Sequence, residues 1–354
     1  MRYLGVLLAT VAAAQSNPDI ILNHTFETEA SGWTSLGQGA SVRLAHDPAQ
    51  VHDGTGALAF TYEVQPRRTA VAVLQASSAF AAMARLRFWV RADHDTTLAA
   101  LLAEKKPGGG NYLAWFYAPA DVWQQIELAP SDFILGDGPQ DPVDSDGKLD
   151  LDALQGVGIL DLASFVAGMT ENPDIPVTID RASGTHTLLV DDFQVLASPA
   201  PRHAGIDRFD RGFLQWMTLG GMQLKLSAAG NPLEGPALQA TYRQTGGEYQ
   251  VLVRRLANLD LSRATHLAFD IASEHEITLV VSLEVKKPGA PQGPRYSLTI
   301  CPPGGREVFH VNLKLADFEG PGKLDPAQLK SILLADVTGA EQPNTVWIGN
   351  VEAQ

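Results

Sequence analysis

The sequence predicts an all-β protein built from two tandem antiparallel β-sandwiches of the jelly-roll type. Three observations lead to this fold class. The chain carries nearly the same stretch twice, LLAEKKPG at residues 101–108 and SLEVKKPG at residues 282–289. Each copy contains about eight short runs that alternate apolar and polar residues, separated by Gly, Pro and Asp, whereas helical periodicity is nearly absent. A single cysteine allows no intrachain disulfide, so each copy has to fold on a core of its own.

The two copies stay in step over their whole length. Residues 132–133 (DF) correspond to residues 317–318, and residues 147–150 (GKLD) correspond to residues 322–325. A period of roughly 180 residues is far longer than a solenoid or propeller unit, so the repeat is a whole domain. We therefore predict a first domain at residues 17–197, a Pro-rich linker at 198–203 and a second domain at 204–354.

The N-terminus has the pattern of a secretory signal. Arg2 is followed by an apolar run at residues 4–13 and by small residues at 12–14. We interpret residues 1–14 as a signal peptide, because the run is too short to span a bilayer. No other stretch approaches the length of a transmembrane segment. We expect the mature protein to be secreted, in the periplasm or outside the cell.

Composition narrows the choice of ligand. The formal net charge of −14 argues against nucleic acid and anionic membrane surfaces, which bind basic footprints. A neutral ligand is easier to reconcile with this charge. The oligomeric state is left open by the sequence.

The predicted elements follow the alternation along the chain. In the first copy, strands are expected at residues 86–91, 98–103, 112–117, 123–128, 156–160 and 187–195. Short helical segments are expected at 151–155 and 326–330, each after an Asp that can cap the first turn. Cys301 ends a strand-like run, and we expect it to be a small packed residue. The first copy is longer at 137–146 and 168–185, where its loops either form a binding rim or are tolerated insertions.

Several short motifs resemble a known family. Residues 23–27 (NHTFE) with Trp33, residues 54–58 (GTGAL) and residues 190–193 (VDDF) are similar to the first, third and last strands of galactose-binding-like jelly rolls. Those are carbohydrate-binding modules that accompany secreted glycosidases. The middle of each copy resembles family 11 modules and the complex I intermediate-associated protein domain. The resemblance implies a non-catalytic domain that binds carbohydrate.

The same resemblance implies a structural Ca²⁺ near the chain ends of the first domain. Carried over, its ligands are Glu27, the region from Asp53 to Ala57, and Asp192 or its neighbour Asp191. Oxygen ligands of this kind suit Ca²⁺. The second copy has Gly349-Asn350 instead of the two aspartates, which puts a second site in doubt. The alternative is that these acids only cap the edge of the sheet.

The candidate ligand site comes from a difference between the copies. One strand carries Trp115 and Tyr117 where the second copy has Thr299 and Cys301, and another carries Trp89 and Arg91 where it has Asp270 and Ala272. If the two strands lie in one sheet, Trp89, Arg91, Trp115 and Tyr117 line one face. Sugars stack their C–H faces on aromatic rings and hydrogen-bond through their hydroxyls, so this face would bind a glycan. The alternative is that Trp115 and Tyr117 pack beneath the longer loops.

Motifs for catalysis are missing. The sequence has no Gly-x-Ser-x-Gly, His-Glu-x-x-His, Walker or dinucleotide-binding motif. One run, Glu274-His275-Glu276, could in principle bind a metal, but it reads as an exposed loop. We therefore predict a non-enzymatic protein that binds a polysaccharide or a cell-surface glycan. The alternatives are a structural or protein-interaction role at the cell envelope and, third, a polysaccharide-degrading hydrolase with a carboxylate pair.

Overall fold

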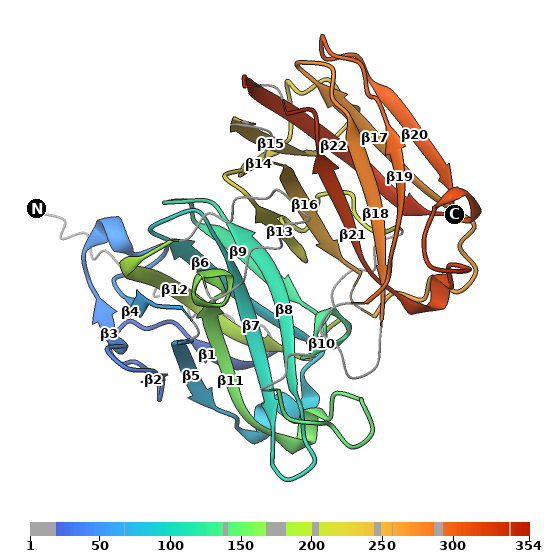
Figure 1. Ribbon diagram of the computed structural model, residues 1–354. Coiled ribbons are helices and arrows are strands. Elements are labelled where there is room, and N and C mark those ends of the chain that lie inside the picture. Colours follow the sequence, from blue (N-terminus) through green and yellow to red (C-terminus); the bar gives the residue numbers. More distant parts are fainter. Residues whose placement is uncertain are drawn as a thin grey trace, which may run out of the picture.

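The protein is almost entirely β, and its strands form two sandwiches that follow one another along the chain (Figure 1). The computed structural model describes residues 19–66, 68–136, 141–167, 182–199, 205–243, 249–256, 258–286, 293–339 and 341–354. The fold class predicted from the sequence is confirmed. The predicted signal peptide and residues 200–203 of the predicted linker lie outside the described residues. In the described part of the chain, no helix has both the length and the apolar character needed to cross a membrane.

Two antiparallel sheets make up the first sandwich. Sheet I contains β1 (Ile20–His24), β3 (Ser41–Ala45), β4 (Ala57–Val64), β6 (Arg85–Ala92), β9 (Gln124–Leu128) and β12 (Gly184–Leu196). Sheet II contains β2 (Thr34–Leu36), β5 (Val71–Gln75), β7 (Thr96–Glu104), β8 (Asn111–Ala118), β10 (Ile134–Leu135) and β11 (Leu154–Asp161). The order in sheet I is β3-β4-β12-β6-β9, with β1 also paired to β12, and the order in sheet II is β10-β8-β7-β11-β5-β2.

The second sandwich repeats this arrangement. Sheet III contains β14 (Gln223–Ser227), β15 (Ala237–Arg243), β17 (His266–Ser273), β20 (Phe309–Lys314) and β22 (Pro343–Ala353). Sheet IV contains β13 (Trp216–Leu219), β16 (Gln250–Arg255), β18 (Leu279–Val285), β19 (Arg295–Ile300) and β21 (Leu329–Asp336). The orders are β14-β15-β22-β17-β20 and β13-β16-β21-β18-β19, so each strand of the second sandwich has a counterpart in the first.

Helices are few and short. They are η1 (Pro48–Gln50), η2 (Ser78–Ala82), η3 (Pro130–Asp132), η4 (Leu151–Ala153), α1 (Ala163–Ala167), η5 (Leu315–Asp317) and η6 (Pro326–Gln328). The helical segments expected near residues 151 and 326 are η4 and η6, each a single 3₁₀ turn that leads directly into a strand. In η6 the expected cap is present, because the side chain of Asp325 accepts a hydrogen bond from the backbone N–H of Ala327.

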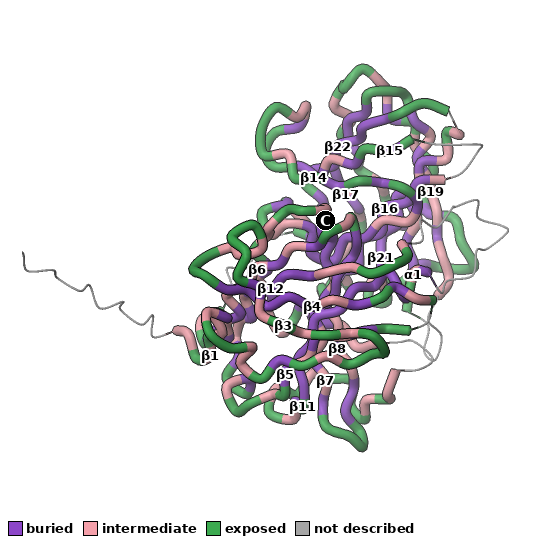
Figure 2. Tube along the Cα trace, turned by 90° about the vertical axis from the view of Figure 1, so that its left-hand side faces the viewer, coloured by how far each residue is buried: buried purple, intermediate pink, exposed green. Residues whose placement is uncertain are grey.

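Alternation places the core between the two sheets of each sandwich. Along β6, buried Leu86, Phe88 and Val90 alternate with partly exposed residues, and all three belong to the core of the first sandwich. Buried residues run through the strands and exposed ones gather in the loops (Figure 2). One packing expectation is wrong. Cys301 is exposed, because β19 ends at Ile300 and the chain leaves the sheet there.

The two sandwiches join at the edge of β8. Strand β10 covers only part of this edge, and the segment before β13 binds to the rest of it. The backbone N–H of Gln215 donates to Trp115 O at 2.6 Å, and that of Tyr117 donates to Phe213 O at 3.4 Å. Side chains strengthen the joint, since Gln215 Nε2 donates to Asp132 O at 2.6 Å. Sheets II and IV are therefore linked edge to edge.

Candidate functional site

The four predicted ligand residues do not share a face. Trp89 and Arg91 lie on β6 in sheet I, whereas Trp115 and Tyr117 lie on β8 in sheet II. The inward side chains of the two strands meet in the core, where the rings of Phe88 and Phe116 have centroids 6.0 Å apart. Their outward side chains therefore point in opposite directions. The expectation of one aromatic face is wrong because alternation along a strand does not reveal which sheet holds that strand.

Trp89 and Arg91 are half-buried on the outer side of sheet I. The ring of His52 stacks on Trp89 with centroids 3.7 Å apart, and Trp123 lies edge-on to His52 at 5.6 Å. Arg91 donates from Nη1 to Ala49 O at 2.6 Å and from Nη2 to an Asp121 carboxylate oxygen at 2.8 Å. The loop that contains η1 thus already occupies one face of Trp89 and part of the Arg91 guanidinium.

Trp115 and Tyr117 pack against the second sandwich. The guanidinium carbon of Arg255 lies 4.1 Å from the centre of the Trp115 ring. Tyr117 is 1% exposed and belongs to the hydrophobic core of the second sandwich, where its ring lies edge-on to Phe213. Its hydroxyl oxygen accepts a hydrogen bond from the backbone N–H of Leu224 at 3.3 Å. The two aromatics are thus covered by the other sandwich, and residues 168–181 of the longer loop lie outside the described residues.

A pocket of about 150 Å³ lies between the sandwiches, with Tyr117 in its wall. The first sandwich contributes the β6–β7 turn, the start of β7 and helix α1, and the second contributes β13 and the turn into β14. The lining residues are Asp95, Thr96, Thr97, Tyr117, Leu162, Ala163, Val166, Ala182, Thr218, Leu219, Gly220, Gly221, Met222 and Gln223. Hydroxyl, amide and carboxylate groups therefore alternate with apolar side chains around one space.

The polar groups at this pocket hold one another in place. Asp95 accepts a hydrogen bond from the backbone N–H of Ala120 at 3.0 Å and another from Gln223 Nε2 at 3.1 Å. Burial, and then the nearby Asp95 carboxylate, raise the pKa of Tyr117 above its ordinary value, so its hydroxyl stays protonated. Asp95 and Gln223 are exposed, whereas Tyr117 is buried. The two exposed side chains thus mark the mouth of the pocket.

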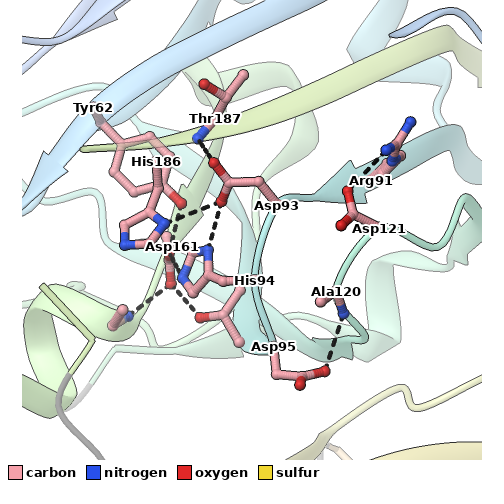
Figure 3. A network of polar contacts seen from close by, with 12 residues as sticks. Tyr62, Arg91, Asp93, His94, Asp95, Ala120, Asp121, Asp161, His186 and Thr187 are labelled. Atoms are coloured by element: carbon pink, nitrogen blue, oxygen red, sulfur yellow. Dashed lines mark hydrogen bonds and ion pairs between the residues drawn. The ribbon is translucent and has the colours of Figure 1, made fainter. Parts of the chain in front are cut away.

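A buried tyrosine–aspartate pair lies behind the pocket and recurs in the second sandwich. Tyr62 donates to Asp161 at 2.5 Å (Figure 3), and Tyr242 donates to Asp336 at 2.6 Å. Burial disfavours the charged form of Asp161, but the attraction of nearby His94 and the hydrogen bonds from Thr96 and Tyr62 outweigh it and hold the pKa of Asp161 below its usual value. The shared pair is part of the fold, whereas the histidines beside Asp161 are found in the first sandwich.

The carboxylates predicted to bind calcium lie around the loop at residues 53–56. Glu27 accepts hydrogen bonds from the backbone N–H of Thr55 at 2.8 Å and from its hydroxyl at 2.5 Å. Asp53 accepts from the N–H of Gly54 at 3.0 Å. Burial, and then the charge of Asp53, raise the pKa of Asp192. The donor set is all oxygen, which fits Ca²⁺.

Asp191, the alternative ligand, is already used by the backbone. It accepts hydrogen bonds from the N–H groups of His52, Asp53 and Asp192 at 2.9 to 3.2 Å. Asp192 is therefore the better ligand of the two. In the second sandwich, Asn350 at the corresponding position donates to Asp270 at 2.7 Å, so an amide takes the place of the carboxylate. A calcium ion in the first sandwich stays a prediction.

Neither the pocket nor the histidines near it were among the sites predicted from the sequence. Asp95 and Gln223 come from different copies, so only the docking of the sandwiches brings them together. The histidines had a signal, because the repeat aligns Asp93-His94-Asp95 with Glu274-His275-Glu276. The second run is exposed, as expected, and among the described residues it belongs to no group of converging metal ligands. In the first copy a second imidazole, that of His186, lies beside this run, although His186 is far away in the sequence.

Comparisons with known proteins return structural neighbours only. No family model matches the chain, and no curated protein matches it. A family 11 carbohydrate-binding module from Clostridium thermocellum, in complex with a β-1,3-1,4-mixed-linked tetrasaccharide, is 18% identical with a TM-score of 0.34, over 43% of this chain and 96% of that chain. The CBM22-1–CBM22-2 tandem of Paenibacillus barcinonensis Xyn10C is 14% identical with a TM-score of 0.32, over 95% of this chain and 98% of that chain. Likeness at this level assigns neither a family nor a ligand.

Proposed function

We propose that this protein is an exported, non-catalytic carbohydrate-binding protein that holds a sugar in the pocket between its two sandwiches. The observation that carries the proposal is the lining of that pocket. It combines an exposed carboxylate and amide, three threonines and the Tyr117 hydroxyl with the apolar side chains of Leu162, Val166, Leu219 and Met222. Convergent polar groups in a partly apolar concavity are typical of small-molecule sites.

The chemistry of the lining favours a neutral polyhydroxyl ligand. A sugar ring presents C–H faces edged by hydroxyl groups, each of which donates and accepts hydrogen bonds. Apolar side chains can cover the faces, while Asp95 accepts and Gln223 both donates and accepts at the edge. The lining residues described contain no Lys, Arg or His, so a phosphate or carboxylate ligand has no counter-charge there. The net charge of −14 points the same way.

The size of the pocket limits how much of a glycan it can enclose. Its volume of about 150 Å³ is below the roughly 300 Å³ at which pockets for drug-sized ligands begin. The pocket therefore accommodates one sugar unit, such as the end of a chain, and the rest of a polysaccharide would lie outside its mouth. Because both sandwiches supply lining residues, binding requires the docked tandem.

The experiment is a glycan screen on the full chain, followed by calorimetry with each hit. Asp95→Ala and Gln223→Ala each remove a polar side chain from an exposed position at the mouth, so they test the pocket without truncating a core side chain. Trp89→Ala is the matched control, because it removes a half-exposed aromatic on the outer side of sheet I. We expect each pocket variant to weaken binding at least tenfold, about 1.4 kcal/mol, and the control to bind like the native protein.

Other results would replace the proposal in defined ways. Binding that is lost in Trp89→Ala or Arg91→Ala but kept in the pocket variants would move the site to the outer side of sheet I. A screen without any bound glycan would refute carbohydrate binding and favour the envelope-interaction alternative. Release of reducing ends from a bound polysaccharide would show a hydrolase instead.

We also propose that Ca²⁺ binds among Glu27, Asp53 and Asp192 as a structural ion. The support is that Glu27 and Asp53 accept hydrogen bonds from the loop at residues 53–56 and that Asp192 lies near their charges; the three carboxylates do not converge within 4.8 Å of one another, so an ion would have to draw them together. A cation would neutralise this charge and fix the loop at residues 53–56 against the end of β1. This site is separate from the pocket, so removing the ion is expected to affect stability rather than glycan specificity.

A further inference from the structure

Asp93, His94 and His186 form a cluster with the chemistry of a metal site. One ligand atom from each lies within 4.8 Å of the other two, and no second group of this kind occurs in the described part of the chain. Asp93 and His94 directly follow β6, and His186 lies near the start of β12. Both imidazoles face the Asp93 carboxylate (Figure 3).

The distances suit a small ion. Asp93 Oδ1 lies 2.8 Å from His94 Nδ1 and 3.1 Å from His186 Nδ1. Around a tetrahedral Zn²⁺ with bonds of about 2.0–2.1 Å, neighbouring ligand atoms are roughly 3.4 Å apart. Each of these two oxygen–nitrogen distances would therefore have to lengthen by a few tenths of an ångström for an ion to enter, and the ligand atoms of all three side chains lie within 4.8 Å of one another. Asp93 is already oriented, because its other oxygen accepts the N–H of Thr187 at 2.7 Å.

In both imidazole rings, the nitrogen that points away from Asp93 is Nε2, and it lies near an oxygen atom. His186 Nε2 lies 3.1 Å from Ser183 O, a carbonyl that can only accept, so this nitrogen carries a hydrogen. His94 Nε2 lies 3.1 Å from an Asp161 carboxylate oxygen, an ion-pair distance at which the two atoms are not well aligned for a hydrogen bond. Carbonyls and carboxylates in this position orient metal-binding histidines and fix their tautomer.

If both rings carry their hydrogen on Nε2, the lone pairs of the two Nδ1 atoms point toward Asp93 Oδ1. A neutral imidazole with its hydrogen on Nε2 has a lone pair on Nδ1, and both Nδ1 atoms face Asp93 Oδ1, which is also an acceptor. A proton on one of the Nδ1 atoms is the alternative to a metal ion between these atoms. Burial opposes charge on His94, but Asp161 and Asp93 raise its pKa. One proton bridges only one of the two nitrogen–oxygen contacts, however, whereas a metal ion would satisfy both.

We propose that His94, His186 and Asp93 bind a Zn²⁺ ion and leave a fourth position for water. Two imidazoles and one carboxylate match the ligands of zinc sites and differ from the all-oxygen set that calcium prefers. The ion can enter from solution, since the side chains of His94, His186 and Asp93 are 15%, 17% and 40% exposed.

The second sandwich is an internal control for this site. His186 pairs with Tyr62 across the sheet, and the residue that pairs in the same way with Tyr242 is Asn344. The Asn344 side-chain oxygen accepts the backbone N–H of His275 at 3.3 Å. An amide cannot replace the imidazole as a zinc ligand, so we expect one zinc ion per chain.

Zinc at this position would connect two parts of the first sandwich that lie far apart in the sequence, at neighbouring strands of sheet I. It would fix the β6–β7 turn to the start of β12, and that turn also carries Asp95. The metal proposal does not depend on a bound sugar. Its failure and that of the glycan pocket are therefore distinguishable, because the two experiments use different ligands and different variants.

The test is zinc binding by the full-length protein after EDTA treatment and dialysis. ZnCl₂ is titrated by calorimetry with CaCl₂ in excess, so that the oxygen cluster near Asp192 is filled with calcium. Metal content and the visible spectrum of the Co²⁺-loaded protein report stoichiometry and geometry. We expect one ion per chain, a tetrahedral Co²⁺ spectrum and a melting temperature that rises with zinc.

Variants then locate the ion. His186→Asn introduces the residue of the second copy and should weaken zinc binding at least tenfold while the melt in EDTA stays native-like. His310→Asn is the matched control, because His310 faces Asp270 at 2.6 Å without a second imidazole. Absence of zinc binding, or equal affinity in native protein and His186→Asn, would overturn the proposal.

Discussion

Tyr117 is the side chain through which the first sandwich enters the core of the second. Its backbone belongs to β8, but its ring is 1% exposed among residues of the second sandwich. The substitution Tyr117→Ala removes this ring and its hydroxyl together. Among the described residues, Tyr117 is the one aromatic of the first sandwich in that core, so its loss should destabilise the second sandwich and weaken the docking of the two.

The cost follows from the contacts that disappear. Replacing a buried aromatic residue by Ala typically costs about 3–5 kcal/mol, which includes the cavity left behind. The edge-on contact with Phe213, with centroids 5.6 Å apart, is part of this loss. Tyr117→Phe keeps the ring but leaves the buried Leu224 N–H without its partner, so it should cost about 1–3 kcal/mol.

Differential scanning calorimetry checks both magnitudes. At about 2–4 °C per kcal/mol for a domain of this size, Tyr117→Ala should lower the transition of the second sandwich by roughly 6–20 °C. It should also separate this transition from that of the first sandwich. Leu36→Ala is the control, since Leu36 is 57% exposed and surface changes stay within about 0.5 kcal/mol. A shift below about 2 °C for Tyr117→Ala would refute the assignment of its ring to the second core.

Three further predictions concern stability. EGTA should lower the melting temperature of the first sandwich and added calcium should restore it, because an ion bound only by the folded state stabilises that state; an unchanged melt, or an equal effect in Asp192→Asn, argues against calcium there. Burial, and then Asp336, raise the pKa of Tyr242, so the unfolded chain ionises first and stability falls as the pH rises above about 10. Tyr242→Phe should flatten that fall in denaturant titrations at pH 9 and 10.5, and an unchanged slope contradicts the pairing. Asp207→Ala should cost about 3–5 kcal/mol, because it leaves buried Arg254 without its carboxylate 3.1 Å away; a loss below 1 kcal/mol in urea unfolding would contradict this.

Much of the fold could be read from the sequence because its signals are local. Period-two alternation identified which residues of β6 and β8 face inward, and Phe88, Ala114 and Phe116 are buried as expected. Alternation does not identify the sheet to which a strand belongs, since that depends on long-range pairing. Trp89 and Trp115 were therefore placed on the correct sides of their strands but wrongly on a common face.

The aromatic residues found only in the first copy have a structural reason other than the predicted ligand face. Trp115 and Tyr117 occur in the first copy because the edge of β8 meets another sandwich. The corresponding strand, β19, is a sheet edge in the second sandwich, and Cys301 just beyond it is exposed. In a tandem repeat, residues present in one copy alone can thus mark the interface between the copies. That interface also creates the pocket, which neither copy contains by itself.

The proposed zinc site could not be recognised as a difference between the two copies. Asp93-His94-Asp95 resembles Glu274-His275-Glu276, which occupies the corresponding turn of the second copy. The two turns diverge in chemistry only through the residue opposite the shared tyrosine, which is His186 in one sandwich and Asn344 in the other. One imidazole beside a carboxylate favours a proton, whereas two imidazoles around one carboxylate oxygen favour a metal ion. A single residue near the start of β12 therefore separates a structural turn from a candidate metal site, and His186→Asn tests that step directly.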